Sequence, residues 1–234
     1  MDEAEVVRLR PYETVVSRAC TDVSLYAPDL DVMAYLMQDL RTLLRSHDAG
    51  KTELLAHEPS VWNVHGLRRR TVVCDLDRVR SRERVCIVGF FGNRRPELPY
   101  ESMDEIDVSL LDEFRYYPGI LSYSSMELAD DYWANLVVHA EPDDREVWRL
   151  SAAHVHAVEM SPVLYSDVRI YNGHLIDGVA GNRAIDIDCI KYWDYETDPV
   201  WRAIREFDPP LTRVRRQIDE PSGSPPGLAE AVTD

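Results

Sequence analysis

The stretch that decides the fold begins with residues 84–92, RVCIVGFFG, a continuous run of apolar and β-forming residues. A run of this length, bounded by polar segments, predicts a buried strand. Apolar residues at helical spacing come next and form one helical face: Met103, Ile106, Leu110 and Phe114. The Pro118-Gly119 pair ends this expected helix.

The following segment predicts a hairpin and then a second helix. Residues 120–128 (ILSYSSMEL) and 132–140 (YWANLVVHA) are expected to be its two strands. The helix is expected from Pro142 to Pro162, and its inward stripe is Val147, Leu150, Ser151, His154 and Val158. Residues 163–171 predict a further strand. The order across residues 84–174 is therefore β-α-β-β-α-β, the ferredoxin-like unit of an α+β fold.

The region before this unit, residues 1–83, is expected to be β-rich and to contain one long helix. An apolar stripe places that helix over residues 29–46: Leu30, Met33, Met37, Leu40 and Leu44. Residues 71–79 could pair with residues 84–92 as a hairpin. The region could also be a degenerate half-barrel that completes a barrel within one chain.

The region after the unit divides in two. Residues 176–208 are expected to hold a strand at 186–195 (DIDCIKYWDY) and a short helix at 198–207, anchored by Trp201. Residues 209–234 are rich in Pro, Gly and Ser and predict a disordered tail. The unit itself is assigned to residues 84–175.

The charge balance excludes several partners. Lys and Arg total 26 against 42 for Asp and Glu, a formal net charge of −16. A field of this sign disfavours nucleic acid and anionic membrane surfaces. No secretory signal or membrane-length apolar run is apparent, and the four cysteines are dispersed without metal-ligand spacing, so we expect a cytoplasmic protein without a metal site. Only two basic residues, Lys51 and Lys191, are lysines, which indicates a GC-rich bacterial source.

The pattern Trp148-x-x-Ser151-x-x-His154 lies in the second helix of this unit. With Pro118-Gly119-Ile120-Leu121 and Trp133-Ala134-Asn135-Leu136 before it, the segment resembles the antibiotic-biosynthesis monooxygenase-like family of the dimeric α+β barrel superfamily. The resemblance implies a homodimer whose two sheets close a barrel, with an apolar pocket between each sheet and its helices. Members include cofactor-free oxygenases, heme-degrading enzymes, heme-binding dehydratases or peroxidases, and small isomerases or cyclases.

Four residues are candidates for the site. His154 could be a general base or an axial ligand to heme, or else a core histidine bonded to a strand. Trp148 could wall the pocket beside a cofactor, or simply pack against the sheet. Tyr123 could donate a hydrogen bond to a substrate oxygen, or lie at the barrel interface. Asn93 ends the first strand, on which heme-degrading relatives use an asparagine nearer the middle, and it could instead be a turn residue.

These residues favour an oxidoreductase or monooxygenase-like enzyme that acts on an apolar or aromatic small molecule, with heme as one possible cofactor, in bacterial specialised metabolism. The alternatives are a cofactor-free cyclase, isomerase or dehydratase, and a non-catalytic dimeric binding protein. Nucleotide-binding and hydrolase motifs such as G-x-G-x-x-G and G-x-S-x-G are absent from the sequence. A cavity beside His154 would favour the enzyme, whereas a filled interface with His154 bonded to a backbone carbonyl would favour the binding protein.

Overall fold

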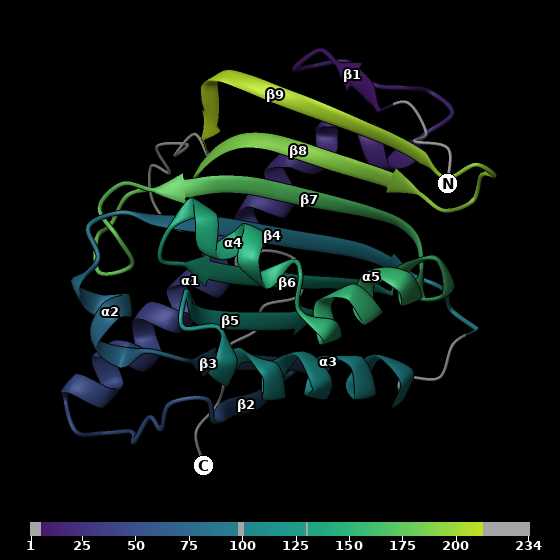
Figure 1. Cartoon of the computed structure of the whole chain (residues 1–234). Helices are drawn as coiled ribbons and strands as arrows, with labels where there is room; N and C mark the ends of the chain where they lie inside the picture. Colours follow the sequence, from purple (N-terminus) through teal and green to yellow (C-terminus); the bar gives the residue numbers. More distant parts are fainter. Residues whose placement is uncertain (1–5, 98–100, 130, 213–234) are drawn as a thin grey trace.

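The strand formed by the apolar run, β4 (Val85–Arg94), lies in the middle of a nine-stranded sheet in the order β1-β9-β8-β7-β4-β6-β5-β3-β2 (Figure 1). The computed structural model describes residues 6–97, 101–129 and 131–212. The other strands are β1 (Val7–Leu9), β2 (Pro59–Val64), β3 (Leu67–Val73), β5 (Ile120–Glu127), β6 (Tyr132–His139), β7 (Tyr165–Leu175), β8 (Asp186–Asp194) and β9 (Trp201–Thr212). The α-helices are α1 (Tyr26–Asp48), α2 (Leu76–Ser81), α3 (Glu101–Glu113), α4 (Pro142–Trp148) and α5 (Ala152–Leu164). Short 3-10 turns are η1 (Ala19–Thr21), η2 (Val23–Leu25) and η3 (Phe114–Tyr116).

The predicted β-α-β-β-α-β order is confirmed. β4, α3, β5, β6, the α4–α5 pair and β7 follow one another in the chain. Their strands are neighbours in the order β7-β4-β6-β5, and every adjacent pair is antiparallel. The mixed α+β class, with a large sheet and one long helix, is as expected from the sequence.

The second helix of the unit is two helices rather than one. α4 ends at Trp148 and α5 begins at Ala152, with Ser151 as the N-cap whose side chain accepts a hydrogen bond from the His154 backbone N–H. Val147 of α4 and Leu150 of the break are 57% and 82% exposed, so their predicted place on the inward stripe is wrong. The pattern Trp148-x-x-Ser151-x-x-His154 therefore contains the last residue of α4, the N-cap of α5 and the residue whose backbone N–H that cap accepts from.

The long helix α1 covers the face of the sheet opposite α3, α4 and α5 (Figure 1). Its apolar stripe packs into one core with the sheet: Met33, Leu36, Met37 and Leu40 meet Ile87, Phe91, Leu136 and Val138. The fit is close at Gly89 of β4, where a Cβ atom would come within 2.8 Å of the Met33 side chain. The homodimer implied by the resemblance would bury this apolar face against a second copy, whereas here α1 covers it.

Residues 1–83 add to the edges of the same sheet. β2 and β3 extend it beyond β5, and β1 joins the other edge beside β9. Within the described residues this region forms no second half-barrel, so that alternative is wrong. The expected hairpin between residues 71–79 and 84–92 is also wrong, because α2 lies between them and β3 pairs with β5.

The end of the chain differs most from expectation. Residues 198–207 were expected to be a short helix, but β9 occupies this region and pairs antiparallel with β8. Pro209 to Thr212, the start of the predicted tail, are the end of β9, and Leu211 pairs with Ile187. The rest of the predicted tail lies outside the described residues. None of the helices described is long and apolar enough to cross a membrane.

Candidate functional site

A cavity of about 270 Å³ lies between the sheet and the helices α3, α4 and α5. Its floor comes from β4, β6, β7 and β8, and its roof from α3 and α5, which pack against each other. Most of its wall is apolar and aromatic, as shown by Phe90, Ile106, Trp133, Val137, Val168 and Trp193. A concave and mostly apolar site with a small number of polar groups is the usual form of a small-molecule site.

His154 lines this cavity, as the sequence predicted. Its ring meets Trp148 edge-on, with 5.7 Å between the ring centroids. Burial lowers the pKa of His154, and the nearby charge of Arg149 lowers it further. Its imidazole makes no hydrogen bond to any residue that the structure describes, and the buried Nδ1 has no partner. The alternative of a histidine bonded to a backbone carbonyl therefore does not hold.

A second imidazole, that of His139 at the end of β6, also lines the cavity. Burial lowers its pKa to about 3, and Arg145 and His154 add to the effect. Its Nδ1 atom is buried and has no hydrogen-bond partner among the described residues. The two imidazoles are thus both neutral at physiological pH, the form in which a histidine can accept a proton.

Tyr123 lies in the cavity wall on β5, and not at a barrel interface. Its hydroxyl donates to Asp107 Oδ1 at 2.7 Å, and Asp107 is ion-paired with Arg70 of β3. Burial raises the pKa of Tyr123. Because its proton is already donated to Asp107, Tyr123 can offer a ligand only an acceptor, which differs from the donor role expected from the sequence.

Trp148 closes the cavity beneath the break between α4 and α5. Its ring contacts Phe114 and Tyr117 at centroid distances of 5.1 and 5.0 Å. Both expected roles therefore coincide in one residue, since Trp148 packs against neighbouring aromatic rings and also forms wall surface beside His154.

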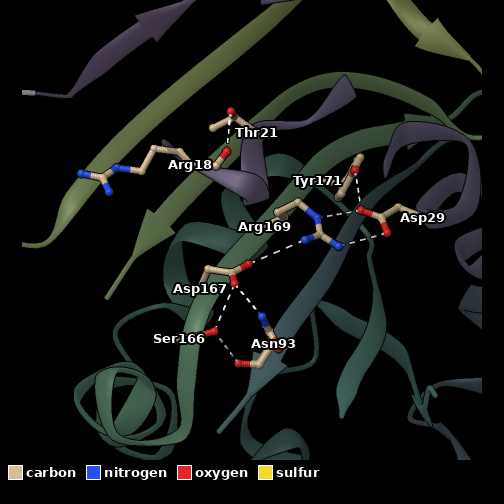
Figure 2. Close-up of polar contacts among 8 residues, drawn as sticks. All are labelled: Arg18, Thr21, Asp29, Asn93, Ser166, Asp167, Arg169 and Tyr171. Atoms are coloured by element: carbon tan, nitrogen blue, oxygen red, sulfur yellow. Dashed lines mark hydrogen bonds and ion pairs between the residues drawn. The ribbon is translucent and has the colours of Figure 1, made fainter. Parts of the chain in front are cut away.

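Asn93 lies outside the cavity. It is on the α1 side of β4, where its Nδ2 donates to Asp167 Oδ2 at 2.9 Å (Figure 2). Asp167 also accepts from Ser166 at 3.1 Å and lies 3.7 Å from the Arg169 guanidinium. Asn93 thus belongs to a polar network between β4 and β7, and the structure does not bring it together with His154, Trp148 and Tyr123.

Sequence reasoning missed several polar residues of the cavity: Asp107, Asn135, His139, Arg145 and Lys191. The period-two alternation of β6 could have found Asn135 and His139, since both share a strand face with Trp133. Lys191 had no comparable signal, because its strand lies outside the recognised unit.

The cavity gives no support for heme, because its volume, about 270 Å³, is below the roughly 300–1,000 Å³ of pockets for drug-sized ligands. A flat ligand of two or three fused rings is closer to this size than a metalloporphyrin is. The heme-ligand role for His154 and the cofactor-contact role for Trp148 are therefore not developed further.

No protein-family model matches the chain, and no curated protein matches it. Solved structures with partial similarity include protein SO0527 from Shewanella oneidensis, at 12% identity and a TM-score of 0.36, covering 40% of this chain and 92% of that one. SnoaB, a cofactor-independent oxygenase from Streptomyces nogalater (mutant N63A), gives 12% identity and a TM-score of 0.32, covering 40% and 91%. An anthrone oxidase-like protein gives 12% and 0.30, covering 46% and 54%. At these values the likeness concerns part of the fold and assigns no activity.

Proposed function

We propose that this protein binds a flat aromatic small molecule in the cavity and begins a monooxygenase-like oxidation by removing a proton from it with His154. One observation carries the proposal: the cavity wall holds an imidazole that makes no hydrogen bond within the described part of the chain. A histidine kept for packing alone would be bonded to the backbone, with no space beside it. The resemblance of residues 84–174 to the monooxygenase-like family supports the same reaction class.

The proposed chemistry needs only the imidazole, the substrate and dioxygen. Neutral His154 takes a proton from a CH₂ group made acidic by flanking aromatic rings or a carbonyl. The carbanion transfers electrons to dioxygen and forms a C–O bond, and the resulting peroxide receives the proton back from His154. Loss of water then leaves a ketone, so the balance is R₂CH₂ + O₂ → R₂C=O + H₂O. The apolar wall keeps water from the base.

Anthrone, a tricyclic ketone with one acidic CH₂ group, is a suitable probe. Oxygen uptake and anthraquinone absorbance are measured with chelator present. We expect His154→Ala to lower the rate by roughly 10²- to 10⁴-fold, the usual contribution of a general base. His156→Ala is the matched control, because His156 is exposed on the same helix and does not line the cavity.

Other outcomes separate the alternatives. Faster interconversion of anthrone and its enol without oxygen uptake would favour an isomerase or cyclase that uses the same base. Binding of anthrone without any reaction would favour a non-catalytic binding protein. An unchanged oxidation rate in His154→Ala would contradict the proposal.

A further inference from the structure

One end of the cavity is positively charged, although the chain carries a formal net charge of −16. Arg145, Arg149 and Lys191 all line the cavity, and all three lie near enough to Glu146 to lower the pKa of its carboxyl. Among the lining residues that the structure describes, Asp107 is the one carboxylate, and it is already paired with Arg70. The cavity therefore combines an apolar body with a surplus of cations, and cations in a partly dry site favour a bound anion.

Arg145 is held in a fixed position at this end. Its Nη1 donates to Asn172 Oδ1 of β7 at 3.1 Å, and its Nε contacts Glu146 Oε1 at 3.2 Å. The third nitrogen, Nη2, donates to no residue of the described ranges, so one guanidinium edge remains for a ligand. Glu146 also binds Arg149 at 3.0 Å, at the half-exposed rim, so its charge is shared between two arginines.

Lys191 is the second cation available to a ligand. It lies on β8, opposite Ile170 of β7, just outside the ferredoxin-like unit (Figure 1). Residues 6–97, 101–129 and 131–212 place no carboxylate within ion-pair distance of its ammonium group. The charge of Lys191 helps to lower the pKa of the nearby Glu146, and Asp188 of the same strand is bonded to His174 at 3.0 Å. Lys191 thus brings a positive charge to the cavity and has no ion pair of its own among the described residues.

We propose that the ligand of this cavity carries a carboxylate that binds Lys191 and Arg145, with its rings lying along the apolar wall toward α3. This inference rests on the proposed function and names its ligand class, an aromatic carboxylic acid. A carboxylate fits better than a phosphate, because its two oxygens match the two donors present. These donors are the Nη2 of Arg145 and the ammonium group of Lys191. The rings would then lie beside His154, next to the proton to be removed.

The test compares 2-naphthoate with 2-naphthamide, which has the same shape but no charge. Binding is measured by isothermal titration calorimetry at low salt. We expect naphthoate to bind wild-type protein at least about tenfold more tightly, the usual effect of one charge-assisted hydrogen bond. Lys191→Met should lower the affinity for naphthoate more than that for naphthamide, and so reduce the preference. Lys51→Met is the matched control, because Lys51 is exposed and remote from the cavity lining.

The small number of lysines allows a direct readout. Reductive ¹³C-methylation keeps the positive charge and labels Lys51, Lys191 and the terminal amine, which the two methionine variants assign. Naphthoate should shift the Lys191 signal and leave that of Lys51 unchanged.

Equal affinities of wild-type protein for naphthoate and naphthamide would overturn the carboxylate inference, while the aromatic cavity itself would stand. A parallel loss of both affinities in Lys191→Met would also overturn it, since it would indicate a structural role for the lysine. If neither probe binds, both this inference and the proposed function fail.

Discussion

His139 is 1% exposed, and its pKa lies at about 3 instead of the ordinary 6.5. Burial is the main cause, because an apolar cavity wall disfavours the imidazolium form. The unfolded chain binds a proton at this histidine below pH 6.5, whereas the folded protein does so only near pH 3. The contribution of His139 to stability is therefore fully present above pH 6.5 and is lost progressively as the pH falls.

This lowered pKa gives a prediction for acid stability. Between pH 7 and pH 5, His139 should reduce the free energy of unfolding by about 2 kcal/mol. His139→Gln, which cannot be protonated, should lose that much less over the same interval in urea denaturation. His156→Gln should behave like wild-type protein, since His156 is exposed. An identical pH dependence in His139→Gln would contradict the prediction, since it would show that folding does not change the pKa of His139.

Arg205 shows what a residue pattern cannot reveal. It is fully buried, and its guanidinium donates to the Tyr26 and Tyr192 hydroxyls and to backbone carbonyls near the N-terminus, including that of Arg10 at 3.0 Å. These partners lie up to 195 positions away in the sequence. Arginine is usually a surface residue, so Arg205 gave no indication of a buried position. The sequence pattern therefore did not predict the inward-facing residues of β9.

Helix α1 contacts the sheet through a buried ion pair as well as through its apolar stripe. Asp29 of α1 accepts from Arg169 Nε at 2.8 Å and Nη2 at 3.2 Å, and from the Tyr171 hydroxyl at 2.7 Å (Figure 2). Both Arg169 and Tyr171 belong to β7. Removing Asp29 leaves the buried Arg169 guanidinium with only the more distant carboxylate of Asp167, 3.7 Å away, as its counter-charge.

We therefore predict that Asp29→Ala lowers the free energy of unfolding by about 3–5 kcal/mol. The double variant Asp29→Leu/Arg169→Met should recover much of that loss, because neither charge of the buried pair then remains. Both are measured by urea denaturation. Glu206→Ala, which breaks the exposed pair with Arg8, should cost less than about 1 kcal/mol. A loss in Asp29→Ala no larger than in Glu206→Ala would mean that the pair is solvated in solution.

The elements that sequence analysis found are those whose pattern is complete within one segment. β4 is continuously apolar and α1 carries a regular stripe, so each could be assigned alone. Pairing was harder, because it depends on distant segments: β3 lies beside β5 and not beside β4. An apolar stripe shows that a helix is covered, but not what covers it, so the sequence could not place α1 against the open face of the unit.

At the scale of the whole molecule, α1 occupies the place that a second copy would take in a barrel of two chains. We therefore predict that light scattering at micromolar concentration gives the monomer mass of 26.9 kDa. The reason is that the apolar area of this face is already buried in the core with α1. Twice that mass, stable on further dilution, would contradict the prediction and require an interface elsewhere.

The candidate site also extends beyond the segment that carried the family resemblance. His154, Trp148 and Tyr123 lie within residues 84–174, and sequence analysis selected all three. Lys191, Trp193 and Tyr195 come from or just after β8 and complete the wall. The resemblance could therefore indicate the general site, whereas the charged end depends on sheet pairing between β7 and β8.

The covering of the sheet by α1 has a kinetic consequence. In a barrel shared between two chains, an active site forms only in the dimer. The number of active sites therefore falls when the protein is diluted below the dissociation constant of the dimer. Here the helix that shields the core is tethered to it by the same polypeptide. The rate of the proposed oxidation per molecule of protein should thus stay constant from micromolar to nanomolar concentration.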